Sequence, residues 1–181
     1  KQICMNMLKG KIISLRKVKQ EDLKFFRDWR NTSDIWQNNT QFILLNLKQQ
    51  DSWFNRINSI NTKERMFTII NDKQNPIGIC GFVQIDSDNK NAKIAIIIGK
   101  TRLHSKGIGT ESLNLLLEYG FKKLKIHRID AEVIEYNKKS INFFQKLGFE
   151  PDAVMRDYIF RNGKWWNLVV LSKISTISEH N

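Results

Sequence analysis

The feature that most constrains the fold is a glycine-containing turn at residues 105–110, between a strand pattern and a helix pattern. Residues 92–99 form a nearly continuous apolar run, which is typical of a strand covered on both faces. After the turn, apolar residues fall on one stripe of a helix, namely Leu113, Leu116, Leu117, Phe121 and Leu124. The sequence therefore predicts a strand–turn–helix unit whose turn opens directly into a helix N-terminus.

This turn has the properties of an anion site. The first backbone N–H groups of a helix have no partner within the helix, and the helix dipole is positive there. Gly107 and Gly109 carry no side chain that would keep a phosphate away from the backbone. The spacing fits neither the P-loop nor the dinucleotide fingerprint. From the two glycines alone, a phosphate cradle and a plain tight helix start are equal alternatives.

The rest of the chain alternates strand and helix patterns without a repeat or a linker. We expect strands at residues 11–18, 65–71, 77–85, 92–99, 128–134, 153–161 and 164–174, and helices at 20–30, from 46, after the turn at 105–110 to about 124, and at 137–146. Asn46 and Gln49 have the spacing of a capping box, and Asn162-Gly163 is typical of a hairpin turn. This order predicts one α+β (mixed α/β) domain over residues 1–181, with a twisted mixed sheet of about seven strands and about four helices.

Charge and cysteine usage narrow the class of protein. The 30 basic and 18 acidic residues give a net charge of +12, which suggests an anionic partner, although a lysine-rich codon habit explains it equally well. There is no dense basic run, which argues against nucleic acid. Cys4 and Cys80 have no metal or redox spacing, so we expect no metal site and a reducing compartment.

Apolar runs in the sequence are short. None approaches the roughly 18 residues of a membrane span. The first residues also show no signal-peptide core. We therefore expect a cytoplasmic protein without a membrane span, and the sequence leaves a homodimer open.

Two motifs resemble those of the GCN5-related N-acetyltransferases (GNAT). The pattern of their coenzyme A pyrophosphate loop, Arg/Gln-x-x-Gly-x-Gly/Ala, corresponds to His-Ser-Lys-Gly-Ile-Gly at residues 104–109. The family pattern Asn-x-x-Ala, followed by Tyr-x-Lys-x-Gly-Phe, corresponds to Asn137, Ser140 and the run 144–149. The expected order of elements is similar to that of the GNAT fold over nearly the whole chain.

A narrower resemblance covers the N-terminal half. Residues 25–31 and 52–54 are similar to the branch that holds ribosomal-protein and spermidine acetyltransferases. Together with residues 42–46, they look most like the N-acetyltransferases of nucleotide-linked amino sugars in pseudaminic acid synthesis.

The resemblance implies acetyl-CoA as co-substrate, lying between the central strand and the next one. Three strand residues would pair with the pantetheine arm, and the turn amides would bind the pyrophosphate. The implied coenzyme-binding residues are Ile96, Ile97, Ile98, His104, Ser105, Lys106, Gly107, Ile108, Gly109, Thr110, Asn137 and Phe144. Residues 100–128 carry seven basic and two acidic side chains, a balance that suits the phosphates of coenzyme A or simply a solvated helix face.

The implied reaction is direct attack of an amine on the thioester, which needs an unprotonated amine and a leaving thiolate. Relatives often place Glu near the position of Lys93 and Tyr at that of Phe144, so both usual proton-transfer groups are missing here. A thiol pKa of about 8.5 still makes the thiolate a tolerable leaving group. Candidates for the base are Asp86, Glu132 and Tyr158, and a solvated surface role is the alternative for each.

Residues of the first helix and the last hairpin are the expected acceptor contacts. Arg30 can hold a phosphate or carboxylate, or else form a structural ion pair. Trp29 and Trp166 can stack on a base or sugar ring, or else pack in the core. The function we expect is acetylation of a small, phosphate-bearing amine, namely a nucleotide-linked amino sugar. Alternatives are a protein N-terminus or another small amine, with polyamines disfavoured by the positive charge, and a degenerate CoA-binding protein.

Overall fold

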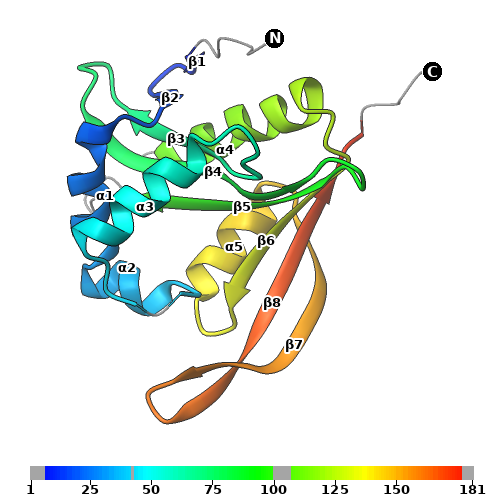
Figure 1. The fold of residues 1–181 in the computed structure, drawn as a ribbon. Coiled ribbons are helices and arrows are strands. Elements are labelled where there is room, and N and C mark those ends of the chain that lie inside the picture. Colours follow the sequence, from blue (N-terminus) through cyan, green and yellow to red (C-terminus); the bar gives the residue numbers. More distant parts are fainter. Residues whose placement is uncertain (1–6, 42, 100–106, 177–181) are drawn as a thin grey trace.

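The computed structural model describes residues 7–41, 43–99 and 107–176. Its elements, in chain order, are β1 (Leu8–Lys9), β2 (Ser14–Lys17), η1 (Gln20–Asp22), α1 (Leu23–Arg30), α2 (Ser33–Asn38), α3 (Leu47–Ile57), β3 (Arg65–Ile70), β4 (Pro76–Asp86), β5 (Asn91–Ile98), α4 (Ile108–Glu118), the π-helical η3 (Tyr119–Lys123), β6 (Arg128–Ile134), α5 (Lys138–Lys146), β7 (Glu150–Arg161) and β8 (Lys164–Ile174). The α+β class and all of the expected strands and helices are confirmed (Figure 1).

Two elements were missing from the prediction, so the described residues form eight strands rather than about seven and five α-helices rather than about four. The strand β1 is only two residues long, which is too short to show a period. The helix α2 has six residues, and none of them is buried. The side chain of its N-cap residue, Thr32, does not cap it. It therefore lacks the apolar stripe by which a helix is read from sequence.

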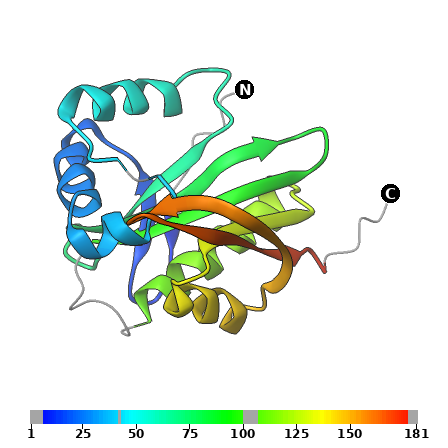
Figure 2. The same cartoon turned by 90° about the horizontal axis from the view of Figure 1, so that it is seen from below.

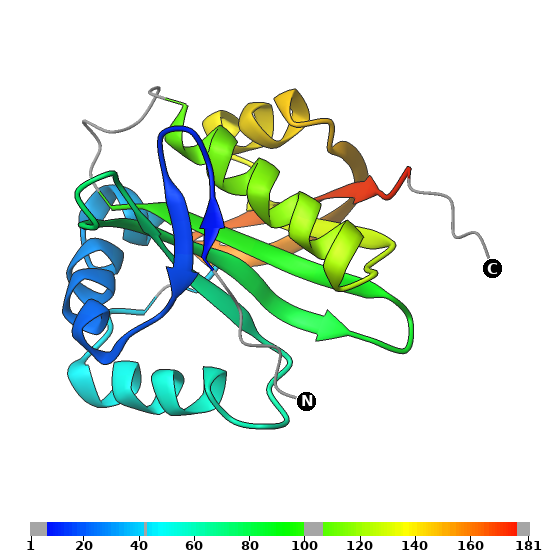
Figure 3. The ribbon, with the colours of Figure 1, turned by 90° about the horizontal axis from the view of Figure 1, so that it is seen from above.

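The strands form one mixed sheet in the order β1-β2-β3-β4-β5-β6-β8-β7, between two layers of helices. Neighbouring register pairs of β4 and β5 alternate between the layers. Cys80 and Ile96 belong to the core shared with α4 and α5, whereas Ile79 and Ile97 pack with α1 and α3. Figure 3 shows α4 and α5 side by side over the sheet, with α1 to α3 gathered beside its other strands. The central strand is thus covered on both faces, as predicted.

The strands β5 and β6 form the parallel pair of the described sheet, and they separate after three residues. The last register pair is Lys93 with Asp130, although β5 continues to Ile98 and β6 to Ile134. Figure 1 shows the two strands diverging from their paired end towards the end where α1 and α2 lie. The backbone N–H and C=O groups of β5 and β6 that face this gap form no hydrogen bonds between the two strands. Such groups require another hydrogen-bond partner or water.

The last two strands form a long hairpin. Its turn contains Asn162 and Gly163, with φ angles of 51° and 73°, so the predicted hairpin turn is confirmed. Figure 2 shows the hairpin reaching across towards α2, far from the chain's C-terminal end. Within the described residues, no helix is both long and apolar enough to cross a membrane.

Candidate active site

The gap between β5 and β6 opens into a cavity of 1580 Å³. One part is lined by the diverging strands, the start of α4 and one side of α5, and the other part by α1, α2 and α3 with the segments between them. Pockets for one small ligand usually measure about 300–1,000 Å³, so the cavity has room for a coenzyme and an acceptor together.

The start of α4 is the helix N-terminus at which the sequence predicts a phosphate-binding turn. Gly107 precedes the helix in a left-handed conformation with φ of 77°, and no side chain caps the helix N-terminus. Gly107, Gly109 and Thr110 line the cavity, whereas the side chain of Ile108 is buried in the core. The backbone N–H groups at this end therefore lie beside the cavity, and no side chain of the described residues caps them. His104, Ser105 and Lys106 lie outside the described residues.

The predicted coenzyme residues on β5 and α5 also reach the cavity. Ile96, Ile97 and Ile98 line it along the unpaired edge of β5. Asn137 lines it while its side-chain oxygen accepts a 3.1 Å hydrogen bond from the N–H of Ser140, which caps α5. Phe144 also lines it, although most of its ring packs in the core and only 5% is exposed.

A close helix contact favours glycine at position 109. A Cβ atom placed on Gly109 would lie 3.2 Å from the ring of Phe143, which is on α5. The absence of a side chain lets α4 and α5 approach each other beside the cavity. The second glycine of the turn therefore has a packing role as well as an expected role in phosphate access.

An ion pair stands where the two strands separate. The Lys93 ammonium lies 2.5 Å from Oε1 of Glu132, and both side chains line the cavity. The Glu132 side chain is 27% exposed, so the carboxylate remains reachable. The family resemblance places a glutamate on β5 near position 93. Here that position is Lys93, and a glutamate pairs with it from the neighbouring strand β6.

Asp86 and Tyr158 are not brought to this cavity. Asp86 lies at the end of β4, where it accepts hydrogen bonds from the backbone N–H and the side-chain amide of Asn89, and these bonds lower its pKa. Tyr158 is 57% exposed on β7. Neither residue lines the cavity. Glu132 is the base candidate that the geometry favours.

Of the three expected acceptor contacts, Arg30 lines the cavity and the two tryptophans do not. Trp29 is a core residue, and a Cβ on Gly99 would come within 2.2 Å of its ring. Trp166 packs edge-on against Tyr136, with ring centroids 4.9 Å apart, and lies under the ammonium of Lys164. The packing alternative therefore describes both tryptophans.

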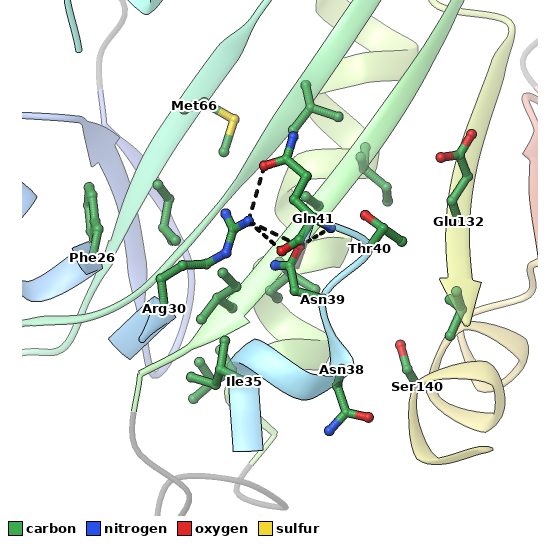
Figure 4. Close-up of a pocket in the computed structure, with 18 of the residues that line it drawn as sticks. Phe26, Arg30, Ile35, Asn38, Asn39, Thr40, Gln41, Met66, Glu132 and Ser140 are labelled. Carbon is green, nitrogen blue, oxygen red and sulfur yellow. Dashed lines mark hydrogen bonds between the residues drawn. The ribbon is translucent and has the colours of Figure 1, made fainter. Parts of the chain in front are cut away.

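Arg30 points into the part of the cavity that α1, α2 and α3 line (Figure 4). Its Nη2 donates to Asn39 Oδ1 at 3.2 Å and to Gln41 Oε1 at 3.0 Å. No carboxylate lies within ion-pair distance of it among the described residues. Burial lowers the pKa of this guanidinium, which nevertheless stays charged.

The sequence did not reveal the polar wall that faces Arg30. The last residue of α2 and the three residues after it line the cavity, and all four carry a side-chain amide or hydroxyl, namely Asn38, Asn39, Thr40 and Gln41. A run of Asn and Gln has the composition of an ordinary surface loop. Only its contacts with distant parts of the chain turn it into a wall, and no local pattern encodes these contacts.

Diverging parallel strands with a helix N-terminus at the open end are the arrangement expected for the acyl-coenzyme A site of an acetyltransferase. A family model described as an acetyltransferase (GNAT) domain matches residues 13–150. The chain therefore belongs to the GNAT family of N-acetyltransferases, as the two motifs indicated, and its fold is the α+β GNAT fold.

Similar proteins lie in the branch expected from the N-terminal half. An uncharacterized N-acetyltransferase p20 from Bacillus licheniformis is 28% identical over 93% of this chain and 96% of its own length. A spermidine N(1)-acetyltransferase from Vibrio cholerae is 24% identical over 84% of this chain and 87% of its own. A crystal structure of the Vibrio cholerae spermidine N-acetyltransferase with CoA and spermine superposes with a TM-score of 0.83 at 23% identity, covering 90% and 95% of the two chains.

Proposed function

We propose that this acetyltransferase acts on the primary amine of a small molecule, which it binds in the cavity beside α1–α3. The observation that carries the proposal is the separation of β5 and β6 after Lys93, because it leaves a strand edge, a carboxylate and a helix N-terminus around one space. The similarity to spermidine acetyltransferases supports a small amine as the acceptor. It gives no support to the expected amino sugar.

The residues present fit acetyl-CoA, which supplies the activated thioester when bound. The unpaired backbone edge of Ile96–Ile98 would hold the pantetheine arm. The N–H groups that follow Gly107 would bind the pyrophosphate, because they are uncapped at the positive end of the α4 dipole. His104, Ser105 and Lys106 stay predicted contacts of this loop.

Glu132 is the proposed general base. An amine acceptor is protonated at neutral pH and must lose a proton before it can attack the thioester. Glu132 takes that proton at the narrow end of the gap, either directly or through one water molecule. The Lys93 ammonium at 2.5 Å stabilises the carboxylate charge and fixes its direction. Phe144 has no proton to give, so the thiol departs as the thiolate.

A nucleotide-linked amino sugar is the second candidate acceptor. The observation that favours it is Arg30, a cavity-lining cation with no carboxylate partner in the described parts of the chain. A phosphate-bearing acceptor would bind such a guanidinium, whereas a polyamine would be repelled by it.

The experiment is an acceptor panel assayed by release of free thiol from acetyl-CoA. The panel contains spermidine, amino acids and their amides, free and phosphorylated amino sugars, a nucleotide-linked amino sugar and short peptides with free N-termini. Turnover with one or more of the small amines is the expected result. Turnover with peptides alone would replace the proposed acceptor class by a protein N-terminus.

A further inference from the structure

We propose that Arg30 binds an anionic group of the acceptor, so that the natural substrate is an amine that also carries a carboxylate or a phosphate. The inference rests on the proposed function and narrows its acceptor class. It starts from how the charge of Arg30 is compensated within the folded chain.

Arg30 differs from three arginines that the structure pairs with acids. Arg16, Arg56 and Arg128 each form an ion pair with a carboxylate. In the described ranges, Arg30 hydrogen-bonds only to neutral oxygens, those of Asn39 and Gln41. Neutral oxygens solvate a cation without neutralising it, and a poorly hydrated charge without a counterion costs free energy. An anion arriving in the cavity would supply the missing charge.

The donors of this guanidinium are also incompletely used. All three of its hydrogen bonds to described residues leave from Nη2. Its Nε is buried and has no hydrogen-bond partner, and Nη1 makes no hydrogen bond to the described residues. Arginine presents its donors as a planar fork that matches the oxygens of a carboxylate or a phosphate. Arg30 thus has donor capacity left for a ligand.

The charges around the cavity favour an anion as well. The described lining contains six basic side chains, Arg30, Lys48, Arg56, Lys93, Lys139 and Lys146, and three acidic ones, Asp34, Glu64 and Glu132. Two of the acids are already paired, Glu64 with Arg56 and Glu132 with Lys93. The third, Asp34, is exposed on α2 and does not pair with Arg30. The lining is therefore positive, which disfavours a polycation.

The positions of Arg30 and Glu132 set how such an acceptor would lie. Figure 4 shows the two side chains on opposite sides of the cavity, with Asn39 and Thr40 between them. The amine has to be near Glu132, where the gap between β5 and β6 narrows. The anionic group would then reach Arg30 on the opposite side of the cavity, past the polar wall of residues 38–41. The acceptor is expected to carry its amine and its anion at separate ends.

A purely structural role for Arg30 predicts something different, because holding Asn39 and Gln41 would matter equally for all acceptors. The test therefore uses matched acceptor pairs that differ only in the anion: glucosamine 6-phosphate against glucosamine, and γ-aminobutyrate against its amide. Arg30→Gln removes the positive charge and retains an N–H donor for the side-chain oxygens of Asn39 and Gln41. Arg27→Gln, on the same helix and paired with the exposed Asp28, is the control.

We expect the wild type to prefer the anionic member of at least one pair, and the pair that responds distinguishes phosphate from carboxylate. Arg30→Gln should lower kcat/KM for that member by about tenfold or more and leave the neutral member within about twofold. Arg27→Gln should change neither. No preference in the wild type, or an equal loss for both members, would overturn the subsite while leaving the proposed function standing.

Binding of the reaction products tests the subsite without relying on turnover. With CoA at saturation, calorimetric titration should show N-acetylglucosamine 6-phosphate, or N-acetyl-γ-aminobutyrate, binding about tenfold more tightly than its neutral counterpart, and Arg30→Gln should abolish the difference. Equal affinities in both pairs would overturn the subsite. A clear preference without any thiol release in the panel would instead contradict the proposed transfer reaction alone.

Discussion

Arg161, the last residue of β7, donates a 3.1 Å hydrogen bond from Nη2 to the backbone carbonyl oxygen of Asn39, which is 122 positions earlier in the chain. The same nitrogen donates to the carbonyl oxygen of Thr40 at 3.0 Å. Two positions before Asn39, the carbonyl oxygen of Gln37 accepts a hydrogen bond from the Tyr136 hydroxyl. The polar wall of residues 38–41 is therefore held by β7 and by the segment that precedes α5, in addition to Arg30.

The first prediction concerns the hydrogen bonds that anchor the polar wall to Arg161. Arg161→Met should loosen the wall and raise KM for the acceptor by about tenfold, because two charge-assisted hydrogen bonds to backbone oxygens are lost. KM for acetyl-CoA should stay within about twofold, since the proposed coenzyme contacts lie on β5, α4 and α5. Steady-state kinetics with each substrate varied in turn measures both values.

Arg156→Met is the matched control for this anchor, because Arg156 lies on the same strand and is exposed. It should leave both KM values unchanged. An equal rise of both KM values in Arg161→Met would show that the residue supports the fold in general and not the wall in particular.

The second prediction concerns the proposed base. Glu132→Gln should lower kcat by about 100-fold at pH 7, because the acceptor amine then loses its proton without a positioned carboxylate. The deficit should shrink as the pH rises towards the pKa of the amine, where the free amine becomes abundant. The measurement is kcat/KM against pH for both enzymes. A deficit that stays constant with pH would show that Glu132 positions substrate and transfers no proton.

A matched control for Glu132 is the exposed Glu150 at the start of β7, and Glu150→Gln should keep wild-type activity. Lys93→Met removes the partner of Glu132 and leaves the carboxylate in place. It should reduce kcat less than Glu132→Gln does, since only the orientation of the base is lost. A larger loss in Lys93→Met than in Glu132→Gln would assign the catalytic role to the lysine.

The third prediction tests the phosphate-binding turn. Gly107 and Gly163 have nearly the same left-handed φ, 77° and 73°, and a Cβ has room at both positions. Tryptophan at either position should therefore cost a similar amount of stability, about 1–2 kcal/mol for the left-handed backbone. Only Gly107→Trp should abolish CoA binding, because only Gly107 lines the cavity. Thermal unfolding and calorimetric CoA titration of both variants check this, and unchanged CoA affinity in Gly107→Trp would refute the loop assignment.

Most of the fold could be read from the sequence because the long elements repeat their burial pattern locally. The apolar run of β5 and the stripe of α4 each follow from contacts that recur at a fixed period. The Asn46–Gln49 capping box and the Asn162-Gly163 turn were equally predictable, since each lies within four residues of chain. The strand β1 and the helix α2 are too short to contain a period.

The site was predictable only where a local motif specifies it. The start of α4 was found because the helix N-terminus and its glycines are contiguous in sequence. Glu132 could not be separated from Asp86 by spacing, because what decides between them is the point at which β5 and β6 stop pairing. Trp29 has the same pattern whether it lines a site or fills a core. Such distinctions depend on packing between distant segments.

The last prediction concerns a buried carboxylate that sits away from the cavity. Asp22 is fully buried and accepts hydrogen bonds from both terminal nitrogens of Arg16 at 2.7 and 2.8 Å, from the Lys19 backbone at 3.0 Å and from the Thr68 hydroxyl at 2.7 Å. Burial by itself raises the pKa of Asp22, but these hydrogen bonds outweigh it, led by those from Arg16. The pKa is therefore below its ordinary value of 3.8. The network ties η1 to β2 and β3.

A lowered folded-state pKa stabilises the protein above the ordinary pKa, and this contribution is lost as the pH falls through the lowered value. Asp22→Asn should therefore destabilise the fold by about 3 kcal/mol at pH 7, because it leaves Arg16 without its counterion. The difference from wild type should narrow as the pH is lowered below 3.8. Urea unfolding of both proteins at a series of pH values measures the two stability curves.

Asp28→Asn, at an exposed ion pair on α1, should change stability by less than about 1 kcal/mol at every pH. A penalty for Asp22→Asn that does not vary with pH would show that shape, and not the charge of the carboxylate, holds this network together.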